Sequence, residues 1–374
     1  MSSPRIDVDL DRIGQNAQEL VRRAAARGVT VTAITKAMRG LPALGRVVLE
    51  AGAVALGDSR VEHIERLRAD GIDAPIVLIR SALVSEVDRV VVAADTSCAT
   101  EVEIVELLSA AAVRADRVHG IILMVELGDL REGIMPADLA DAIECCLAFP
   151  NIEIRGIGTN LACRNGVVPD DRNMGELSDL ATAVEAQFGF ALGVVSGGNS
   201  STLDWLGTTE QLGRIDNLRL GEAILLGRDP LHSTPIAGLH HDAATIFAEV
   251  IESKHKPRRA WGARAQSTFA PPVDAPSTEA TPTEATPAEA TTTDEDHGWH
   301  SLLAIGHQDT DPLDLSPPPG LRIIGASSDH LVIASQQRLS LGSEVAFRPG
   351  YSALVRAMSS RTMQSVIRGG PDSH

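Results

Sequence analysis

The chain has 374 residues, 44% of them hydrophobic, and a formal net charge of −17 at pH 7. The length favours two domains, and the strong negative charge argues against nucleic acid or an anionic membrane as a partner. No apolar run reaches the roughly 18 residues of a membrane span, the N-terminus lacks a secretory pattern, and the four cysteines form no CxxC pair. We therefore expect a cytoplasmic protein with reduced thiols.

From about residue 5 to residue 230, short apolar runs alternate with amphipathic stretches of helical character. The expected strands are residues 29–35, 53–57, 75–80, 93–98, 119–127, 152–160, 192–197 and 217–221. The expected helices include residues 41–51, 60–70, 83–91, 100–114, 137–148 and 173–188. Eight such strand–helix units predict an α/β fold of the (β/α)8 TIM-barrel type. The pattern alone leaves a doubly wound open sheet as the alternative.

After about residue 236 the pattern predicts antiparallel strands joined by turns. These strands are expected within residues 243–253, 301–306, 321–335 and 344–348, and residues 351–367 are expected to form a closing helix. Residues 265–297, rich in Pro, Thr, Ala and Glu, are expected to be a disordered acidic insertion. The predicted domains are a barrel over 1–235 and a C-terminal β domain over 236–374.

Lysine is rare in this chain, with three residues among 33 basic ones, and Lys36 is the only lysine in the first 253 residues. It directly follows the apolar, β-branched run 29–35. Arginine can replace lysine at most surfaces, but not as a neutral amine that attacks a carbonyl. Lys36 is therefore a candidate Schiff-base lysine for pyridoxal 5′-phosphate (PLP), unless it is an ordinary residue left by a bias toward arginine.

Polar and glycine-rich residues follow directly after several of the expected strands. They are Lys36, 58–60, 129–131, Asn160 and 196–201. A TIM barrel brings such positions together on one face, where its active sites are built. The loops after strands seven and eight, 196–202 and 218–222, suit phosphate binding because their glycines allow close approach to an anion.

Three polar segments each have two interpretations. The segment 128–133 is either a solvated turn with a helix N-cap at Asp129 or a loop that aims Arg131 into the barrel mouth. In the second domain, 304–311 and 325–331 are either turns or walls of a site. His307 and Asp309 form an H-x-D pair with some metal-ligand character.

Taken together, eight segments in chain order resemble the ornithine racemase group of the alanine racemase-like, fold-type III PLP enzymes. The resemblance spans nearly the whole chain apart from the insertion. Its segments are Lys36, 128–133, 156–163, 195–201, 218–228, 304–311, 325–331 and 347–354.

The resemblance implies a PLP-binding TIM barrel, a C-terminal β domain and a homodimer with shared active sites. It also implies that Lys36 is the Schiff-base lysine and one racemisation base. Arg131 would lie near the PLP phenolic oxygen and the substrate carboxylate, and Asn160 against the pyridine ring.

By the same resemblance, the phosphate would be held by Ser200, by the backbone of Gly221 and Glu222, and by the hydroxyl of Tyr351. Arg219 would face the pyridine nitrogen. An arginine cannot accept a proton there and disfavours ring protonation, whereas a carboxylate would support it. The Cα carbanion is then less delocalised, which suits a racemase.

The chain departs from alanine racemases at two places. His307 stands where their second catalytic base, a tyrosine, is expected, so we predict that His307 of the partner subunit performs the second proton transfer. Gly40 replaces the tyrosine that follows the family's lysine by four residues, so phosphate binding must depend more on the loops after strands seven and eight.

The expected substrate is an amino acid, ornithine or another basic one, with alanine as a further candidate. Ser328, Asp309 and Asp329, together with Arg131, are the predicted substrate-binding residues, because a carboxylate can hold a distal ammonium group. Equally, these aspartates can cap turns. The racemase needs no metal; the alternative is a metal-assisted PLP lyase of the D-threonine aldolase or D-serine dehydratase type, in which His307 and Asp309 would be ligands.

Overall fold

The computed structural model describes residues 4–258, 260–262 and 297–370. These residues divide into two compact units. The larger comprises residues 9–243 with 368–370, and the smaller comprises 4–8 with the described part of 244–367. Apart from residue 297, the predicted acidic insertion over 265–297 lies outside the described residues.

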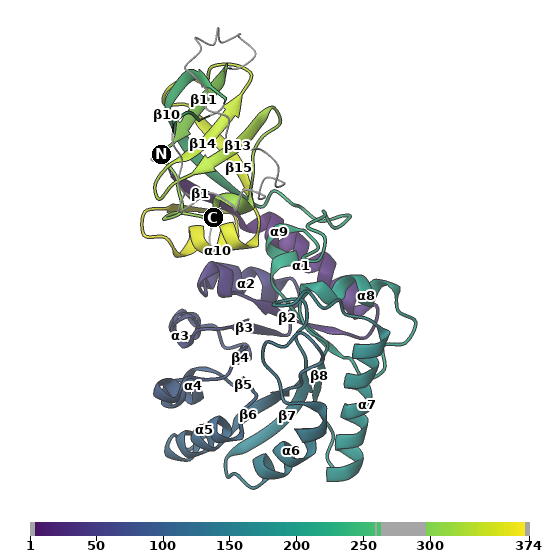
Figure 1. The fold of residues 1–374 in the computed structure, drawn as a ribbon. Helices are drawn as coiled ribbons and strands as arrows, with labels where there is room; N and C mark the ends of the chain where they lie inside the picture. The colour runs from purple at the N-terminus through teal and green to yellow at the C-terminus, as the bar shows by residue number, and fades with distance from the viewer. Residues whose placement is uncertain (1–3, 259, 263–296, 371–374) are drawn as a thin grey trace. The chain divides into compact units, whose positions relative to one another are not determined.

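The larger unit is built on a closed barrel of eight parallel strands in chain order (Figure 1). The strands are β2 (Thr30–Ile34), β3 (Ala55–Asp58), β4 (Ile76–Leu78), β5 (Thr96–Ala99), β6 (His119–Met124), β7 (Ile152–Gly158), β8 (Val194–Ser196) and β9 (Asn217–Leu220). β9 pairs with β2 and closes the barrel. The predicted TIM barrel is confirmed, and every expected strand overlaps an observed one.

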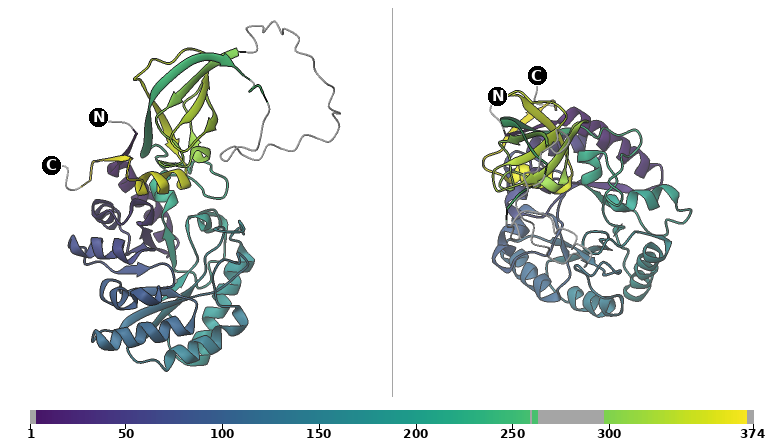
Figure 2. Two further views of the ribbon diagram at one scale, coloured as in Figure 1. Left: turned by 60° about the vertical axis from the view of Figure 1, so that its left-hand side comes forward. Right: turned by 45° about the horizontal axis from the view of Figure 1, so that its top comes forward.

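Helices follow the strands and form a ring around them, which is visible in the right-hand view of Figure 2. The helices are α1 (Leu10–Ala25), α2 (Pro42–Glu50), α3 (Val61–Ala69), α4 (Val87–Ala93), α5 (Val102–Arg114), α6 (Leu139–Leu147), α7 (Asp171–Phe188), α8 (Leu203–Thr208) and α9 (Glu222–Leu226). Short 3-10 helices are η1 (Lys36–Met38), η2 (Val84–Glu86), η3 (Pro136–Asp138) and η4 (Ser200–Thr202).

Local chemistry explains where several of these elements begin and end. Asp9 caps α1 by accepting from the Arg12 N–H at 3.0 Å. Asp170 and Asn173 form a reciprocal capping box at the start of α7, and Gly189 ends that helix in a left-handed conformation. The strands of the barrel are almost wholly buried, because helices cover their outer face and side chains fill the interior.

The described part of the smaller unit is an antiparallel sheet with the α-helix α10 (Tyr351–Ser359). Its strands are β1 (Arg5–Asp9), β10 (Ala244–Pro257), β11 (His297–Leu303), β12 (Leu315–Ser316), β13 (Leu321–Ala326), β14 (Leu331–Ser335), β15 (Glu344–Pro349) and β16 (Gln364–Arg368); η6 (Pro312–Asp314) precedes β12. The order is β12-β15-β10-β11-β14-β13, with β1 paired to β10 and β16.

Two features of this unit differ from the sequence prediction. Residues 4–8, expected in the barrel domain, join the sheet because β1 pairs along β10, from Arg5 opposite Phe247 to Val8 opposite Ala244. The helix expected over 351–367 ends at Ser359, because Ser360 has an extended backbone conformation. The chain then forms β16, whose Gln364 N–H donates to the Pro4 carbonyl at 3.1 Å.

Candidate active site

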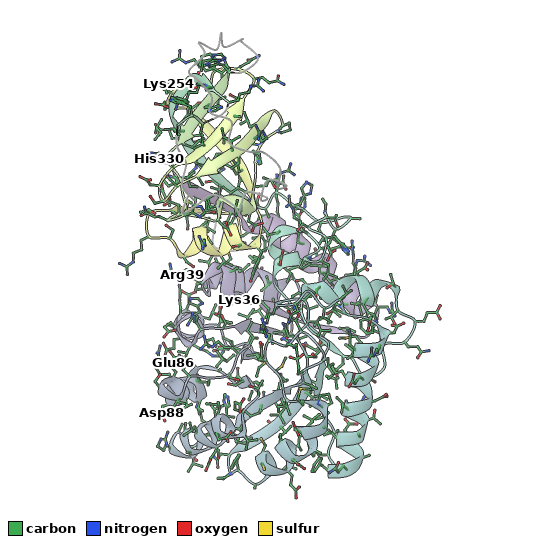
Figure 3. The ribbon with its side chains drawn as sticks, viewed as in Figure 1. Lys36, Arg39, Glu86, Asp88, Lys254 and His330 are labelled. Carbon is green, nitrogen blue, oxygen red and sulfur yellow. The ribbon has the colours of Figure 1, made fainter. Side chains whose placement is uncertain are left out.

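Lys36 stands directly after β2 and begins the short helix η1, at the position labelled in Figure 3. Its side chain is largely enclosed, and burial lowers the pKa of its amine. The neighbouring cations Arg131 and Arg219 lower this pKa further, whereas Cys163 and Asp58 oppose them. The site therefore favours the neutral, nucleophilic amine more than water does.

Arg219 lies on β9 with only 6% of its surface exposed. One terminal nitrogen donates to the Ser196 hydroxyl, and the other donates to the Thr159 carbonyl at 2.7 Å. Gly158 leaves room for it, since a Cβ at that position would lie 3.3 Å from the guanidinium. Burial lowers the pKa of Arg219, and the charge of Arg131 adds to the effect. The guanidinium is thus fixed at the carboxyl ends of the strands.

The loops after β8 and β9 converge on the Ser200 hydroxyl. This oxygen accepts from the backbone N–H groups of Gly221 at 3.3 Å and Ala223 at 3.2 Å. The Asn199 side chain caps η4 by accepting from the Ser201 N–H. Backbone N–H groups and a hydroxyl gathered in this way are suitable donors for a phosphate group. Glu222, predicted to contribute its backbone, begins α9 beside them.

Asp129 has a role that the sequence did not indicate. It is 1% exposed, and the next helix, η3, begins only at Pro136, so the predicted N-cap interpretation is wrong. Its carboxylate instead accepts from the backbone N–H groups of Cys163, Arg164 and Asn165 at 3.1, 2.9 and 3.0 Å. These bonds lower the pKa of Asp129 against the effect of its burial. Asp129 therefore anchors the loop after β7 to the loop after β6.

Arg131 and Asn160 lie on the two loops that Asp129 joins. Arg131 forms an ion pair with Glu132 and lies near enough to Lys36 and Arg219 to lower the pKa values of both. The Asn160 amide donates to Cys163 Sγ at 3.0 Å, and its oxygen accepts from Asn199 at 3.2 Å. The barrel thus brings together the residues predicted from its separate loops.

In the smaller unit, the two polar segments predicted as walls of a site or as turns lie side by side. The backbone N–H groups of His307 and Gln308 donate to the carbonyls of Ser327 and Ser328 at 3.0 and 2.9 Å. Asp329 has an exposed side chain and accepts from Ser328 at 3.0 Å. That bond is the main reason that the pKa of Asp329 is lowered, so its carboxylate stays charged.

Asp309 and Tyr351 are held within the same unit. Asp309 is 7% exposed, and its oxygens accept from the Gly306 N–H at 3.0 Å and from the Thr362 hydroxyl. These bonds favour the turn-capping alternative for Asp309. Tyr351 is the first residue of α10. Within the described ranges, no group of three or more His, Cys, Asp or Glu side chains could hold a metal ion.

Comparison with known proteins identifies the class. The sequence model described as "Alanine racemase, N-terminal domain" matches residues 8–229. The chain is 33% identical to an ornithine racemase from Acetoanaerobium sticklandii over 97% of this chain and 99% of that one. It is 32% identical to a lysine racemase from Thermotoga maritima over 98% and 99% of the two chains.

Solved structures agree on the fold. The alanine racemase from D-cycloserine-producing Streptomyces lavendulae superposes with a TM-score of 0.70 at 19% identity, covering 99% of this chain and 98% of that one. A D-threonine aldolase from Filomicrobium marinum gives 0.72 at 16% identity, covering 100% and 93%. The chain belongs to the alanine racemase family, as its motifs predict. Among the described helices, none is both long and apolar enough to cross a membrane.

Proposed function

We propose that the protein is a PLP-dependent racemase that interconverts the L- and D-forms of a basic amino acid, such as ornithine or lysine. The observation that carries the proposal is the barrel mouth itself, where Lys36 lies near the buried Arg219, the more exposed Arg131 and the donors around Ser200. The near full-length similarity to an ornithine racemase and a lysine racemase supports the basic substrate, with alanine as the further candidate.

The residues at the barrel mouth fit the cofactor. Lys36 would carry it covalently through an amine whose pKa is lowered by burial. Ser200 and the backbone of Gly221 and Glu222 would hold the phosphate, and Asn160 would lie against the ring. Tyr351 is a further proposed phosphate ligand. The bound cofactor would supply an electron sink that makes the Cα hydrogen of an attached amino acid acidic.

Arg219 favours racemisation over the cofactor's other reactions. Its guanidinium has no lone pair to accept a proton, and its own donors are engaged by Ser196 and Thr159. A fixed cation opposite the pyridine nitrogen disfavours protonation of that nitrogen. Electron density then stays near Cα, where returning the proton completes a racemisation.

Two bases on opposite faces of Cα would move this proton. Lys36 serves one face, and His307 of the partner subunit is the proposed base for the other, because imidazole accepts and donates protons near neutral pH. The proposal includes a homodimer with shared active sites. It also includes a cytoplasmic location, which the four free cysteines support.

For the substrate side chain, Asp329 is the stronger of the two predicted carboxylates. Its side chain is exposed and its pKa is lowered, so it can meet an ammonium group, with Ser328 beside it. Asp309 is buried and engaged at both oxygens, which leaves its binding role with less support. Arg131 is the proposed partner of the substrate carboxylate.

Chiral chromatography tests this function directly. The purified protein is incubated with PLP, EDTA and, separately, L-ornithine, L-lysine, L-arginine, L-alanine, L-serine and D-threonine. A D-enantiomer of a basic amino acid is the expected product, and the fastest conversion identifies the substrate. If nothing racemises, and D-threonine is cleaved or D-serine deaminated only after a divalent metal replaces EDTA, the lyase alternative replaces the racemase.

A further inference from the structure

A buried carboxylate lies one hydrogen bond away from the residue that precedes Lys36. Asp58 ends β3 and is 0% exposed. Its Oδ2 accepts from the Thr35 hydroxyl at 2.7 Å. The pairing of β2 and β3 fixes this contact, since the Thr35 N–H also donates to the Gly57 carbonyl at 2.9 Å. The carboxylate is therefore held at a defined place beside the start of η1.

The other oxygen of Asp58 is also occupied. Oδ1 accepts from the Arg60 N–H at 3.1 Å and lies 2.9 Å from His63 Nδ1, on the first turn of α3. The His63 side chain is 20% exposed, so it connects the buried carboxylate to solvent. Burying a carboxylate is costly unless it is well bonded, and these three donors meet that requirement.

The charges around Lys36 indicate a role for the hydrogen-bonded Asp58 carboxylate. Arg131 and Arg219 repel a proton on the Lys36 amine, and burial acts in the same direction. Cys163 and, to a smaller extent, Asp58 act in the opposite direction. Without an opposing charge, Lys36 would be too weak a base to take the proton from Cα, which a racemisation base must do in one direction of the reaction.

We propose that Asp58 is a positioning residue, the buried counter-charge of the Lys36 amine. The hydrogen bond from His63 to Asp58 limits how strongly this carboxylate favours the protonated amine. The inference rests on the proposed function only in taking Lys36 as the reactive amine. It assigns no substrate. If Asp58 were purely structural, it would stabilise the pairing of β2 with β3, and replacing it would leave the titration of Lys36 unchanged.

The scarcity of lysine makes a direct test possible. In the full chain freed of PLP, reductive methylation with carbon-13 formaldehyde gives NMR signals from three lysines and the N-terminal amine, each of which reports its own protonation. In Asp58→Asn, which keeps the shape of the side chain, we expect the Lys36 titration to move to lower pH by about half a unit. At a fixed pH below the midpoint, that change gives about threefold more neutral amine.

A second variant should shift the same signal in the other direction. In His63→Gln, the Asp58 carboxylate loses a donor that spreads its negative charge, so we expect the Lys36 titration to move to higher pH. The matched control is Glu252→Gln, because Glu252 pairs with both Lys254 and Lys256. It removes the ion-pair partner of those two lysines and should leave the titration of Lys36 in place.

An unchanged Lys36 titration in Asp58→Asn, with wild-type thermal unfolding, would overturn the proposal. So would shifts of the same sign in the Asp58 and His63 variants. Should Asp58→Asn not fold, the His63 variant alone decides, because the absence of its upward shift contradicts the proposal. Neither of these NMR titrations depends on racemisation. Failure of the proposed function would be detected separately, by chiral chromatography.

Discussion

The polar side chains at the amino ends of the barrel strands differ in kind from those at the carboxyl ends. At the amino ends, His119 of β6 lies with Nε2 2.8 Å from the Ser97 hydroxyl of β5, and Arg155 donates to the Thr96 hydroxyl at 3.0 Å. At the carboxyl ends, the charges of Arg131 and Arg219 lower the pKa of Lys36, and Arg131 also lowers the pKa of Arg219. Hydrogen bonds to hydroxyl groups at one end are typical of stability, and basic side chains gathered at the other are typical of a site that binds an anionic group.

Removing the amine at the carboxyl end should give the largest effect. We expect Lys36→Arg to lower racemisation by at least about 10³-fold, because arginine keeps the positive charge but cannot act as the neutral amine. Chiral chromatography measures the rate, and urea unfolding should match that of the wild type. A variant that retained substantial racemisation would remove Lys36 from the proposed mechanism.

Arg219→Gln should have the next largest effect. A neutral amide no longer disfavours protonation of the pyridine nitrogen, so we expect racemisation to fall by about 10²-fold. The reaction should also form some keto acid, which is detected by a coupled dehydrogenase assay. The Thr159 carbonyl and the Ser196 hydroxyl would lose their donor, at a cost of about 1–3 kcal/mol in the free energy of unfolding. Unaltered product ratios would contradict the role given to Arg219.

At the amino ends of the strands, His119 should make the free energy of unfolding depend on pH. Burial lowers the pKa of His119 from 6.5 to about 4, so the unfolded chain binds a proton more readily than the native protein. This contribution to stability is complete above pH 6.5 and is lost as the pH falls toward 4. Between pH 7 and pH 5, we expect a loss of about 2 kcal/mol.

Urea unfolding of wild type and His119→Gln at both pH values checks this prediction. The variant should be less stable at pH 7, because its amide fits the Ser97 hydroxyl less well, but it should lose less stability on acidification. Equal losses in the two proteins would show that other groups cause the acid sensitivity.

The same comparison shows what the sequence could reveal. All eight barrel strands were predictable because strands covered on both faces are continuous apolar runs between helices. The grouping of Lys36, Asn160 and Arg219 was predictable too, since residues that end parallel strands must share one face. The bonds from Asp129 to residues 163–165 could not be foreseen, because they join loops more than 30 residues apart.

The first and last strands of the smaller unit, β1 and β16, could not be predicted from the sequence either. Residues 4–8 resemble any short strand, and only the pairing of β1 with β10 and β16 assigns them to this sheet. Residues 364–368 read as a continuation of α10, yet they form β16, which pairs with β1. Tertiary pairing decided both segments where local propensity did not.

Gly40 provides the most local test, because it probes how tightly the chain after η1 packs against α3. Its φ is +59°, and a Cβ there would lie 2.6 Å from the His63 carbonyl oxygen, so the tyrosine expected in this family has no room. Gly28 has a similar φ of +72° with nothing within 4 Å of its Cβ position, which makes it a matched control. We expect Gly28→Ala to cost about 1 kcal/mol of unfolding free energy through backbone strain alone. Gly40→Ala should cost about 2 kcal/mol, because it adds overpacking against α3. Equal costs in urea unfolding would mean that α3 yields freely, and that the contact of His63 with Asp58 is not held by packing from this side.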